Sequence, residues 1–391
     1  MNKYDFNDIL DRRNNGSMKW ERPYIKKRFQ TDLKDGDKMF PMFIADMDFR
    51  LPEEIMEPVR QRYYYPDLGY FHVQDSFYQS IVHWYKNIHG IELQTEWILP
   101  SVGTISSLHL ACDALVRGQN ILTMTPVYGP FKNCCHIGNM FTCPLLLNEN
   151  RYDIDFESLE QSFEVNRINA ILICNPHNPG GRCWSREELQ RLVDLCRKYE
   201  VYILSDEIHA DLQISENRFT SLIEFHDQYN RIIVSASPNK TFSISGLSTS
   251  YILCADAQIR EIYTDYMNHL HLNSNRLGIE MIEMVYNYGQ DWCLQLQKVI
   301  RSNTDLVVKT MEELNITVMK PDAGFLVWIH MDDSVDADQF ILDLAQKYHV
   351  FLETGSRFVE HYEGWIRINV GTAPKLVEEA MNRFRQMFLE Y

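Results

Sequence analysis

Two short segments place reactive side chains directly after apolar runs. Lys240 stands among small and hydroxyl residues in the segment SASPNKTFSISGL, residues 235–247. Asp206 follows a second apolar run, and a buried carboxylate needs a cation or hydrogen-bond donors beside it. His209 comes three residues later, so a purely structural Asp–His pair is one explanation of this segment. The other is acid–base and nucleophilic chemistry, for which an enclosed amine near a carboxylate is typical.

Two further segments carry groups that suit anion binding and directed hydrogen bonding. Residues 100–104 (PSVGT) precede a helical apolar pattern that runs from Ile105 to Leu115. Free N–H groups and the helix dipole at such a start attract anions, although an ordinary capped helix has the same signature. Residues 174–182 (CNPHNPGGR) are rich in Pro and Gly, which predicts a rigid turn that projects the amide of Asn178. An ordinary turn explains this second segment equally well.

Alternating strands and helices predict where these groups lie. Short β-rich apolar runs occur at residues 121–124, 170–174, 201–204, 231–236 and 250–254. Between two of them, an i, i+3, i+4, i+7 pattern predicts one helical face, made of Leu189, Leu192, Val193 and Cys196. Apolar strands that alternate with helices predict a mostly parallel sheet with both faces covered. Ligands of such sheets bind outside the carboxyl ends of the strands, where Asn178, Asp206 and Lys240 fall.

The two ends of the chain predict a second layer. Residues 1–50 are polar and irregular in pattern, and residues 256–314 resemble one long helical stretch. The remaining pattern predicts strands and helices near residues 325–330, 336–348, 365–370 and 374–389. We therefore predict a large α/β domain over residues 51–285 and a smaller, discontinuous α+β domain of residues 1–50 and 286–391.

Composition narrows the class of protein. The chain has 391 residues, more than one compact domain usually needs, and 38 basic against 54 acidic residues give a formal charge of −16. That balance argues against nucleic-acid or anionic-membrane partners, and no apolar run reaches membrane-spanning length. The nine cysteines form no C-x-x-C pair, and the first residues show no signal-peptide core. We expect a cytoplasmic enzyme with reduced thiols, no disulfide framework and no metal site.

Together, these groups match the requirements of pyridoxal 5′-phosphate (PLP). A lysine forms a Schiff base with it, a carboxylate pairs with its pyridinium nitrogen, and a helix N-terminus holds its phosphate. The expected cofactor is therefore PLP, and the expected small-molecule substrate is an amino acid.

The order of the segments resembles the fold-type I PLP enzymes of the aspartate aminotransferase superfamily, class I/II aminotransferase group. The shared markers are NPGG (178–181), SDEIH (205–209), SPNKTF (237–242) and the arginine of WIRIN (365–369). Within that group the chain is most similar to the MalY/PatB-type cystathionine β-lyases, or C–S lyases. The cues for the subgroup are ADMDF (45–49), LGY (68–70), TPVY (125–128), the histidine of DEIH and the segment 240–247. The resemblance implies the PLP-dependent transferase-like α/β fold.

The resemblance also implies a role for each matching position. Lys240 is similar to the catalytic Schiff-base lysine, and Asp206 to the residue that pairs with the pyridine nitrogen. Asn178 and His209 correspond to the partners of the 3′-oxygen. Arg367 matches the arginine that binds the substrate α-carboxylate with a bidentate fork.

The other implied contacts surround the ring and the phosphate. Tyr128 resembles the aromatic residue that stacks on the ring. Val102 and Gly103 would offer backbone N–H groups to the phosphate, helped by Ser237. Tyr70 resembles a residue that reaches the phosphate of the neighbouring subunit, which implies a homodimer with composite sites.

Three positions depart from the family pattern, and all three lie near the expected cofactor. Gly180 replaces the usual Thr, and Asn239 stands before the lysine where Ser is commoner. Ser248 occupies the position of a phosphate-binding Arg. Met47 and Phe325 are large apolar residues, and we expect them to lie in the hydrophobic core rather than in the lining of the pocket.

The resemblance predicts α,β-elimination from L-cystathionine or a related cysteine S-conjugate, which releases a thiol such as homocysteine, pyruvate and ammonia. An aminotransferase is the closest alternative, because it shares every cofactor residue named above. A PLP-binding regulatory protein with little catalysis is a more distant alternative.

Overall fold

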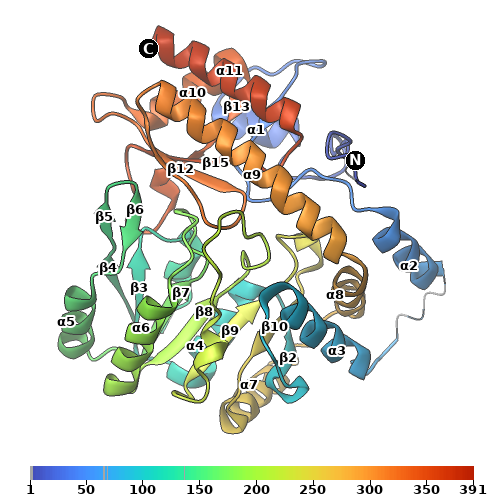
Figure 1. Ribbon diagram of the computed structural model, residues 1–391, viewed down its shortest axis with the longest axis vertical. Helices are drawn as coiled ribbons and strands as arrows, with labels where there is room; N and C mark the ends of the chain where they lie inside the picture. Colours follow the sequence, from blue (N-terminus) through green and yellow to red (C-terminus); the bar gives the residue numbers. More distant parts are fainter. Residues whose placement is uncertain (1–2, 65–66, 68, 136) are drawn as a thin grey trace.

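A mostly parallel sheet forms the centre of the molecule. The computed structural model describes residues 3–64, 67, 69–135 and 137–391. In these residues a sheet of seven strands has the order β2-β10-β9-β8-β7-β3-β4, and only β10 runs antiparallel to its neighbours. Its strands are β2 (Ile98–Ser101), β3 (Asn120–Thr125), β4 (Asn139–Pro144), β7 (Ala170–Cys174), β8 (Tyr202–Asp206), β9 (Ile232–Ala236) and β10 (Ser250–Leu253). The predicted sheet is confirmed (Figure 1).

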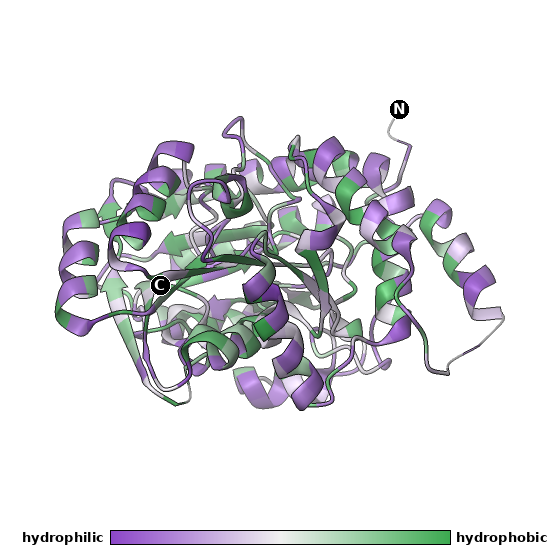
Figure 2. Cartoon of the chain, turned by 90° about the horizontal axis from the view of Figure 1, so that it is seen from below, coloured by the Kyte–Doolittle hydropathy of each residue, from purple (hydrophilic) through white to green (hydrophobic). Residues whose placement is uncertain are grey.

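Helices cover both faces of this sheet, which is why its strands are apolar throughout. Along β7, Ile171 and Ile173 pack in the same cluster as α6, whereas Leu172 packs on the opposite face with α4 and α7. Figure 2 shows the hydrophobic strands inside and the mixed, amphipathic helices outside. The helices of this part are α2 (Glu53–Tyr64), α3 (Asp75–Trp84), α4 (Thr104–Val116), α5 (Phe156–Asn166), α6 (Arg186–Tyr199), α7 (Ala257–His269) and α8 (Arg276–Tyr288).

Helix α6 illustrates how local sequence determines an element. Ser185 and Glu188 form a reciprocal capping box at its start, in which Ser185 Oγ accepts a hydrogen bond from the Glu188 N–H at 3.2 Å. The predicted face is buried, with Leu189, Leu192, Val193 and Cys196 all packed inward.

A second layer combines the C-terminal part of the chain with the N-terminal segment. Its antiparallel sheet has the order β11-β12-β15-β14, and the long helix α9 packs beside α11 (Figure 1). Strand β1 pairs in parallel with β13, and α1 contacts α10. The elements are α1 (Arg22–Phe29), β1 (Phe40–Pro41), α9 (Gln290–Glu313), β11 (Thr317–Met319), β12 (Leu326–His330), α10 (Ala337–Tyr348), β13 (Val350–Phe351), β14 (Glu353–Thr354), β15 (Trp365–Asn369) and α11 (Pro374–Glu390). The domain boundaries proposed from the sequence stay a prediction.

Two expectations about local structure were wrong. The single helical stretch over residues 256–314 is three helices, because Asn275 caps α8 with its side chain and Gly289 separates α8 from α9. Residues 1–50 are also less irregular than their pattern suggested, since they contain α1 and β1. Met47 and Phe325 are buried in the core, as expected.

Short elements complete the chain. They are the hairpin β5 (Leu146–Asn148) and β6 (Arg151–Asp153), and the short helical turns η1 (Tyr85–His89), η2 (Thr95–Trp97), η3 (Gly129–Asn133), η4 (Leu222–Phe225), η5 (Ser245–Leu247) and η6 (Gly355–Arg357). None of the helices among the described residues has both the length and the apolar character needed to cross a bilayer.

Candidate active site

A pocket of about 220 Å³ opens where the carboxyl ends of β7, β8 and β9 face the start of α4. Its lining residues are Ala45, Val102, Gly103, Thr104, Ile105, Ser106, Tyr128, Cys174, Asn178, Asp206, Ile208, His209, Asn239, Lys240, Ser245 and Ser248. Seven of the predicted site residues therefore share one cavity, at the edge of the sheet where the strand pattern placed them.

Lys240 brings the amine into this pocket. It lies in the turn after β9, and its Nζ donates a hydrogen bond to the Ala45 carbonyl oxygen at 2.6 Å. Burial lowers the pKa of Lys240 from its usual value, which favours the neutral amine that a nucleophile or base requires.

Asp206 is the last residue of β8 and brings a carboxylate into the same pocket. Its Oδ1 accepts a hydrogen bond from the Ile208 N–H at 3.2 Å, and burial raises the pKa of Asp206 to about 6. Among the described residues no cation forms an ion pair with Asp206, and the charge of Lys240 offsets the loss of water only in part. A protonated ring nitrogen would supply an ion-pair partner.

His209 does not pair with Asp206, so the structural Asp–His explanation fails. Among the described residues its Nδ1 is buried without a hydrogen-bond partner. Burial, together with the positive charges of Lys240 and Arg367, lowers the pKa of His209 to about 3. The ring is therefore neutral at physiological pH and retains an unused polar atom beside the pocket.

Arg367, on β15 of the second layer, reaches the pocket through Asn178. Its Nη1 donates to Asn178 Oδ1 at 3.1 Å, and its Nη2 donates to the Phe43 carbonyl at 3.1 Å. The nearest carboxylate, Glu353 Oε2, is 4.0 Å away, directly across the β14–β15 pair. The guanidinium is thus held in position but incompletely neutralised, which suits the binding of a substrate carboxylate.

The start of α4 lines the pocket, and the N–H of Gly103 already has a partner there. Gly103 adopts φ +101°, and its N–H already donates to Ser250 Oγ at 2.9 Å. The remaining first-turn N–H groups that face the pocket belong to Thr104, Ile105 and Ser106. The sequence analysis did not name these three residues, although the PSVGT segment indicated this helix start.

Besides Arg367, two predicted contacts lie outside the lining of the pocket. Ser237 is buried beside it, with its Oγ donating to the Thr249 carbonyl at 2.9 Å. Tyr70 is fully exposed and lines a separate groove with residues such as Tyr263 and Arg276. Within one chain the structure therefore does not bring Tyr70 to Lys240.

The pocket fits PLP by the chemistry of its donors. It offers an amine, a carboxylate with no ion-pair partner among the described residues, a neutral imidazole ring and the start of a helix. Tyr128 is partly exposed and provides an aromatic ring in the lining of the pocket. Ser248, where the family pattern has an arginine, also lines the pocket, so the phosphate would depend more on backbone donors. No group of three or more His, Cys, Asp or Glu side chains in the described ranges is arranged to hold a metal ion.

Replacing Asp206 with Asn should stabilise the cofactor-free protein near neutral pH. Because the folded-state pKa of Asp206 lies at about 6 against 3.8 for the free group, its ionisation costs folding energy that grows as pH rises between these values. The free energy of unfolding should increase by about 3 kcal/mol above pH 6 and be unchanged below pH 4. Urea unfolding of both proteins across this range measures the difference, and a gain independent of pH would contradict it.

Comparison with known proteins adds to the geometry. The family model described as aminotransferase class I and II matches residues 60–384. Cystathionine beta-lyase PatB of Bacillus subtilis (strain 168) is 31% identical, over 97% of this chain and 99% of the relative. The solved structure of cystalysin from Treponema denticola, which contains a pyridoxal 5′-phosphate cofactor, has a TM-score of 0.93 and is 28% identical over 99% of both chains. A PLP-bound putative aminotransferase from Clostridium difficile 630 has a TM-score of 0.91 and is 30% identical, over 98% of this chain and 100% of that one.

These likenesses cover nearly the whole chain and agree with the arrangement of the pocket. The fold-type I resemblance found in the sequence is thereby confirmed. The chain belongs to the aminotransferase class I and II family.

Proposed function

We propose that this protein is a PLP-dependent carbon–sulfur β-lyase. It acts on L-cystathionine or a related cysteine S-conjugate and releases a thiol, pyruvate and ammonia. The observation that carries the proposal is the joint enclosure of the Lys240 amine and the Asp206 carboxylate in one pocket, with Arg367 beside it. Elimination as the reaction is supported by the similarity to PatB of Bacillus subtilis, which is a cystathionine beta-lyase by name.

We propose a holding role for each group that would surround the cofactor. Lys240 would bond to it covalently, and Asp206 would accept the hydrogen bond of its ring nitrogen. Asn178 and His209 would contact its 3′-oxygen, while Tyr128 would cover one face of the ring. The first-turn N–H groups of α4 would bind its phosphate.

When bound, PLP withdraws electrons from the α-carbon of an attached amino acid. Arg367 binds the α-carboxylate and orients the α-hydrogen toward Lys240. The Nζ of Lys240 would remove the α-proton, which is possible because burial favours its neutral form. Asp206, when ionised, would favour a proton on the cofactor's ring nitrogen. A thiolate is a good leaving group and would depart from the β-carbon with its bonding electrons, and water would then hydrolyse the remaining enamine to pyruvate and ammonia.

The deciding experiment measures pyruvate from L-cystathionine with no keto acid present. Continuous release of pyruvate, ammonia and thiol over many turnovers is expected. An aminotransferase would instead stop after about one turnover per site, because the amino group stays on the cofactor, and would resume when a keto acid is added. That outcome would contradict the lyase proposal and support the alternative.

We also propose a homodimer, in which Tyr70 completes the site of the second subunit. The support is geometric: Tyr70 is fully exposed, and with Tyr263 and Arg276 it lines a groove of about 960 Å³ away from its own pocket. Light scattering should give about twice 46.2 kDa. Tyr70→Ala should weaken cofactor binding without unfolding the chain, and a fully active monomer would contradict both points.

The nine cysteines, all of them free thiols, support a reducing compartment, and we propose that the protein acts in the cytoplasm.

A further inference from the structure

The turn that carries Lys240 contacts residues 44–48 at two points. Lys240 Nζ donates to the Ala45 carbonyl at 2.6 Å, and Ser243 Oγ accepts a hydrogen bond from the Met47 N–H at 3.2 Å. The carbonyl of Ala45 therefore fixes where the free amine lies when it is not bonded to anything else. Residues 44–48 come from the N-terminal part of the chain, almost 200 positions before the lysine.

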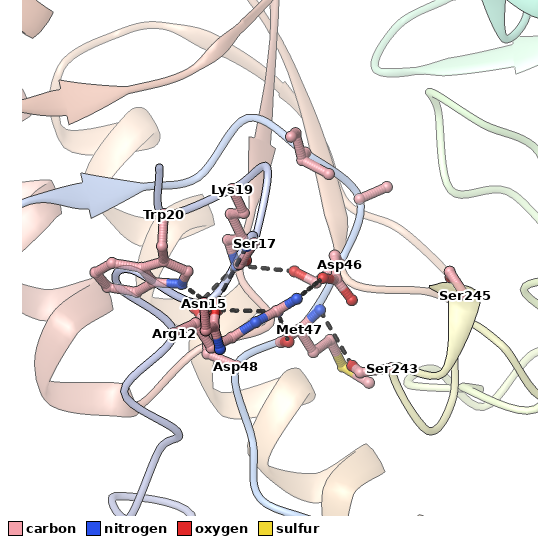
Figure 3. Close-up of polar contacts among 12 residues, drawn as sticks. Arg12, Asn15, Ser17, Lys19, Trp20, Asp46, Met47, Asp48, Ser243 and Ser245 are labelled. Atoms are coloured by element: carbon pink, nitrogen blue, oxygen red, sulfur yellow. Dashed lines mark hydrogen bonds and ion pairs between the residues drawn. The ribbon is translucent and has the colours of Figure 1, made fainter. Parts of the chain in front are cut away.

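Two cations, Arg12 and Lys19, hold residues 44–48 in place by binding Asp46, Met47 and Asp48 of that segment. We call Arg12, Lys19, Asp46 and Asp48 the N-terminal clamp (Figure 3). Arg12 donates from Nη2 to Asp46 Oδ2 at 2.5 Å and from Nη1 to the Met47 carbonyl at 2.8 Å. Lys19 Nζ donates to the Asp46 carbonyl at 2.8 Å and to Asp48 Oδ2 at 2.9 Å. The clamp contains two positive and two negative charges, so it has no net charge.

The second layer supports the same segment. Asn369, two residues after the carboxylate-binding Arg367, donates to the Ile44 carbonyl at 2.5 Å and to the Asp46 carbonyl at 2.8 Å. Asp48 N–H donates to the Gly371 carbonyl at 2.9 Å. The backbone around Ala45 is therefore connected to the substrate-binding strand as well as to the lysine.

The Lys19–Asp48 pair and the Arg12–Asp46 pair of the clamp have different roles. Lys19 and Asp48 are almost completely buried, and Asp48 also accepts from Trp20 Nε1 at 2.8 Å, which is a structural arrangement. Arg12 and Asp46 keep 19% and 18% of their side chains exposed, and the Asp46 charge acts on Lys240. An ion pair in this partly enclosed place is screened less than one on the open surface.

Several charges face Lys240, and they oppose one another. Asp46 and Asp206 stabilise the positive form of Lys240, whereas burial and the positive charge of Arg367 destabilise it. His209, which is neutral, adds no charge. The charge of Asp46 stabilises the positive amine more than that of Asp206 does, although Asp46 was not among the predicted cofactor ligands.

We propose that the Arg12–Asp46 ion pair is a positioning device for the catalytic Lys240, holding the Ala45 carbonyl against the free amine and setting the charge that the amine meets. This inference rests on the proposed function. In that function Lys240 is first bonded to the cofactor and then moves a proton, so the free amine needs a defined position between these two roles. Asp46 and Arg12 act through Ala45 and through their charge, so both are positioning residues.

The test uses Asp46→Asn and Arg12→Gln in the holoenzyme. The measured quantity is the pH midpoint at which the visible absorption of the lysine-bound cofactor changes. Removing the negative charge in Asp46→Asn should lower this midpoint by about one pH unit, and removing the positive charge in Arg12→Gln should raise it by a similar amount. The acidic limb of the pH profile of kcat should move in the same two directions. Arg12→Lys, which retains the charge, should stay near the wild-type midpoint.

The matched controls are Asp8→Asn and Arg50→Gln, the two halves of an exposed ion pair elsewhere in the N-terminal part. Neither should move the midpoint. Shifts of the same sign in Asp46→Asn and Arg12→Gln, or lower activity with no shift, would overturn the inference and leave the clamp a purely structural contact.

The proposed function can fail separately from this inference. A wild-type protein without visible absorption would contradict the proposed cofactor chemistry. The pKa of the Lys240 amine is then measured from the pH dependence of its acetylation by acetic anhydride, where the same opposite shifts are expected. Opposite shifts in a protein that makes no pyruvate would support the inference and reject the lyase.

Discussion

Replacing Lys240 with Ala is expected to lower turnover by about 10⁴-fold or more, because the change removes both the covalent attachment and the base that takes the α-proton. The folded structure should survive, because the Lys240 side chain makes one hydrogen bond, to the Ala45 carbonyl. The smaller alanine also faces an open pocket, so no packed core is lost. The variant should still bind PLP without a covalent bond, through Asp206 and the α4 start, but lose the visible absorption of the lysine-bound form. Absorption spectra and pyruvate release measure the two effects.

Two further measurements decide whether Lys240 is the residue involved. Borohydride reduction of the wild-type holoenzyme, followed by peptide mapping, should place the cofactor on Lys240. Recovery on any other lysine would show that the assignment is wrong. Lys198→Ala is the control, because Lys198 pairs with Glu160 on an exposed helical surface and should leave turnover unchanged.

Replacing Arg367 with Lys should lower kcat/KM by about 100-fold or more, chiefly by raising KM. A lysine cannot present two parallel N–H groups to a carboxylate, and its shorter reach would leave Asn178 Oδ1 or the Phe43 carbonyl without a donor. Cofactor absorption should persist, because Arg367 contacts the pocket through Asn178 and not through Lys240 or Asp206. Steady-state kinetics and absorption spectra separate these effects.

Arg357→Lys is the matched control for that change. Arg357 lies 3.7 Å from the same Glu353 carboxylate, but more than half of its side chain is exposed. Its replacement should alter kcat/KM by no more than about threefold, because the Arg357 side chain is mostly exposed and lysine keeps its charge. An Arg367→Lys enzyme with wild-type KM would show that another group binds the substrate carboxylate.

Local patterns in the sequence were sufficient to predict the sheet and the centre of the site. Asp206 and Lys240 each follow an apolar run, and Asn178 lies in a turn rich in Pro and Gly. In a parallel sheet, residues that follow successive strands meet at one edge whatever the details of packing. The three residues therefore line one pocket, as expected. The resemblance to known enzymes supplied their roles, which periodicity and spacing do not contain.

Helix boundaries and individual donors were harder to predict. The stretch 256–314 has apolar positions at helical spacing throughout, but its breaks depend on the side-chain cap of Asn275 and on Gly289. Gly103 was expected to offer its N–H to a phosphate. That N–H is instead taken by Ser250 Oγ, from a strand almost 150 positions away. Such competition between donors and acceptors is invisible until the strands are placed side by side.

The sequence by itself determined the strand–helix alternation and the residue types at the strand ends, because these depend on hydrophobic periodicity and on neighbours a few positions apart. Only the tertiary structure decided which distant groups touch. The contact of Arg367 with Asn178, that of Lys240 with Ala45 and the pairing of Arg12 with Asp46 all join separate parts of the chain. The physical reason is that their geometry follows from the packing of the second layer against the sheet, and their energies follow from the loss of water when that packing closes.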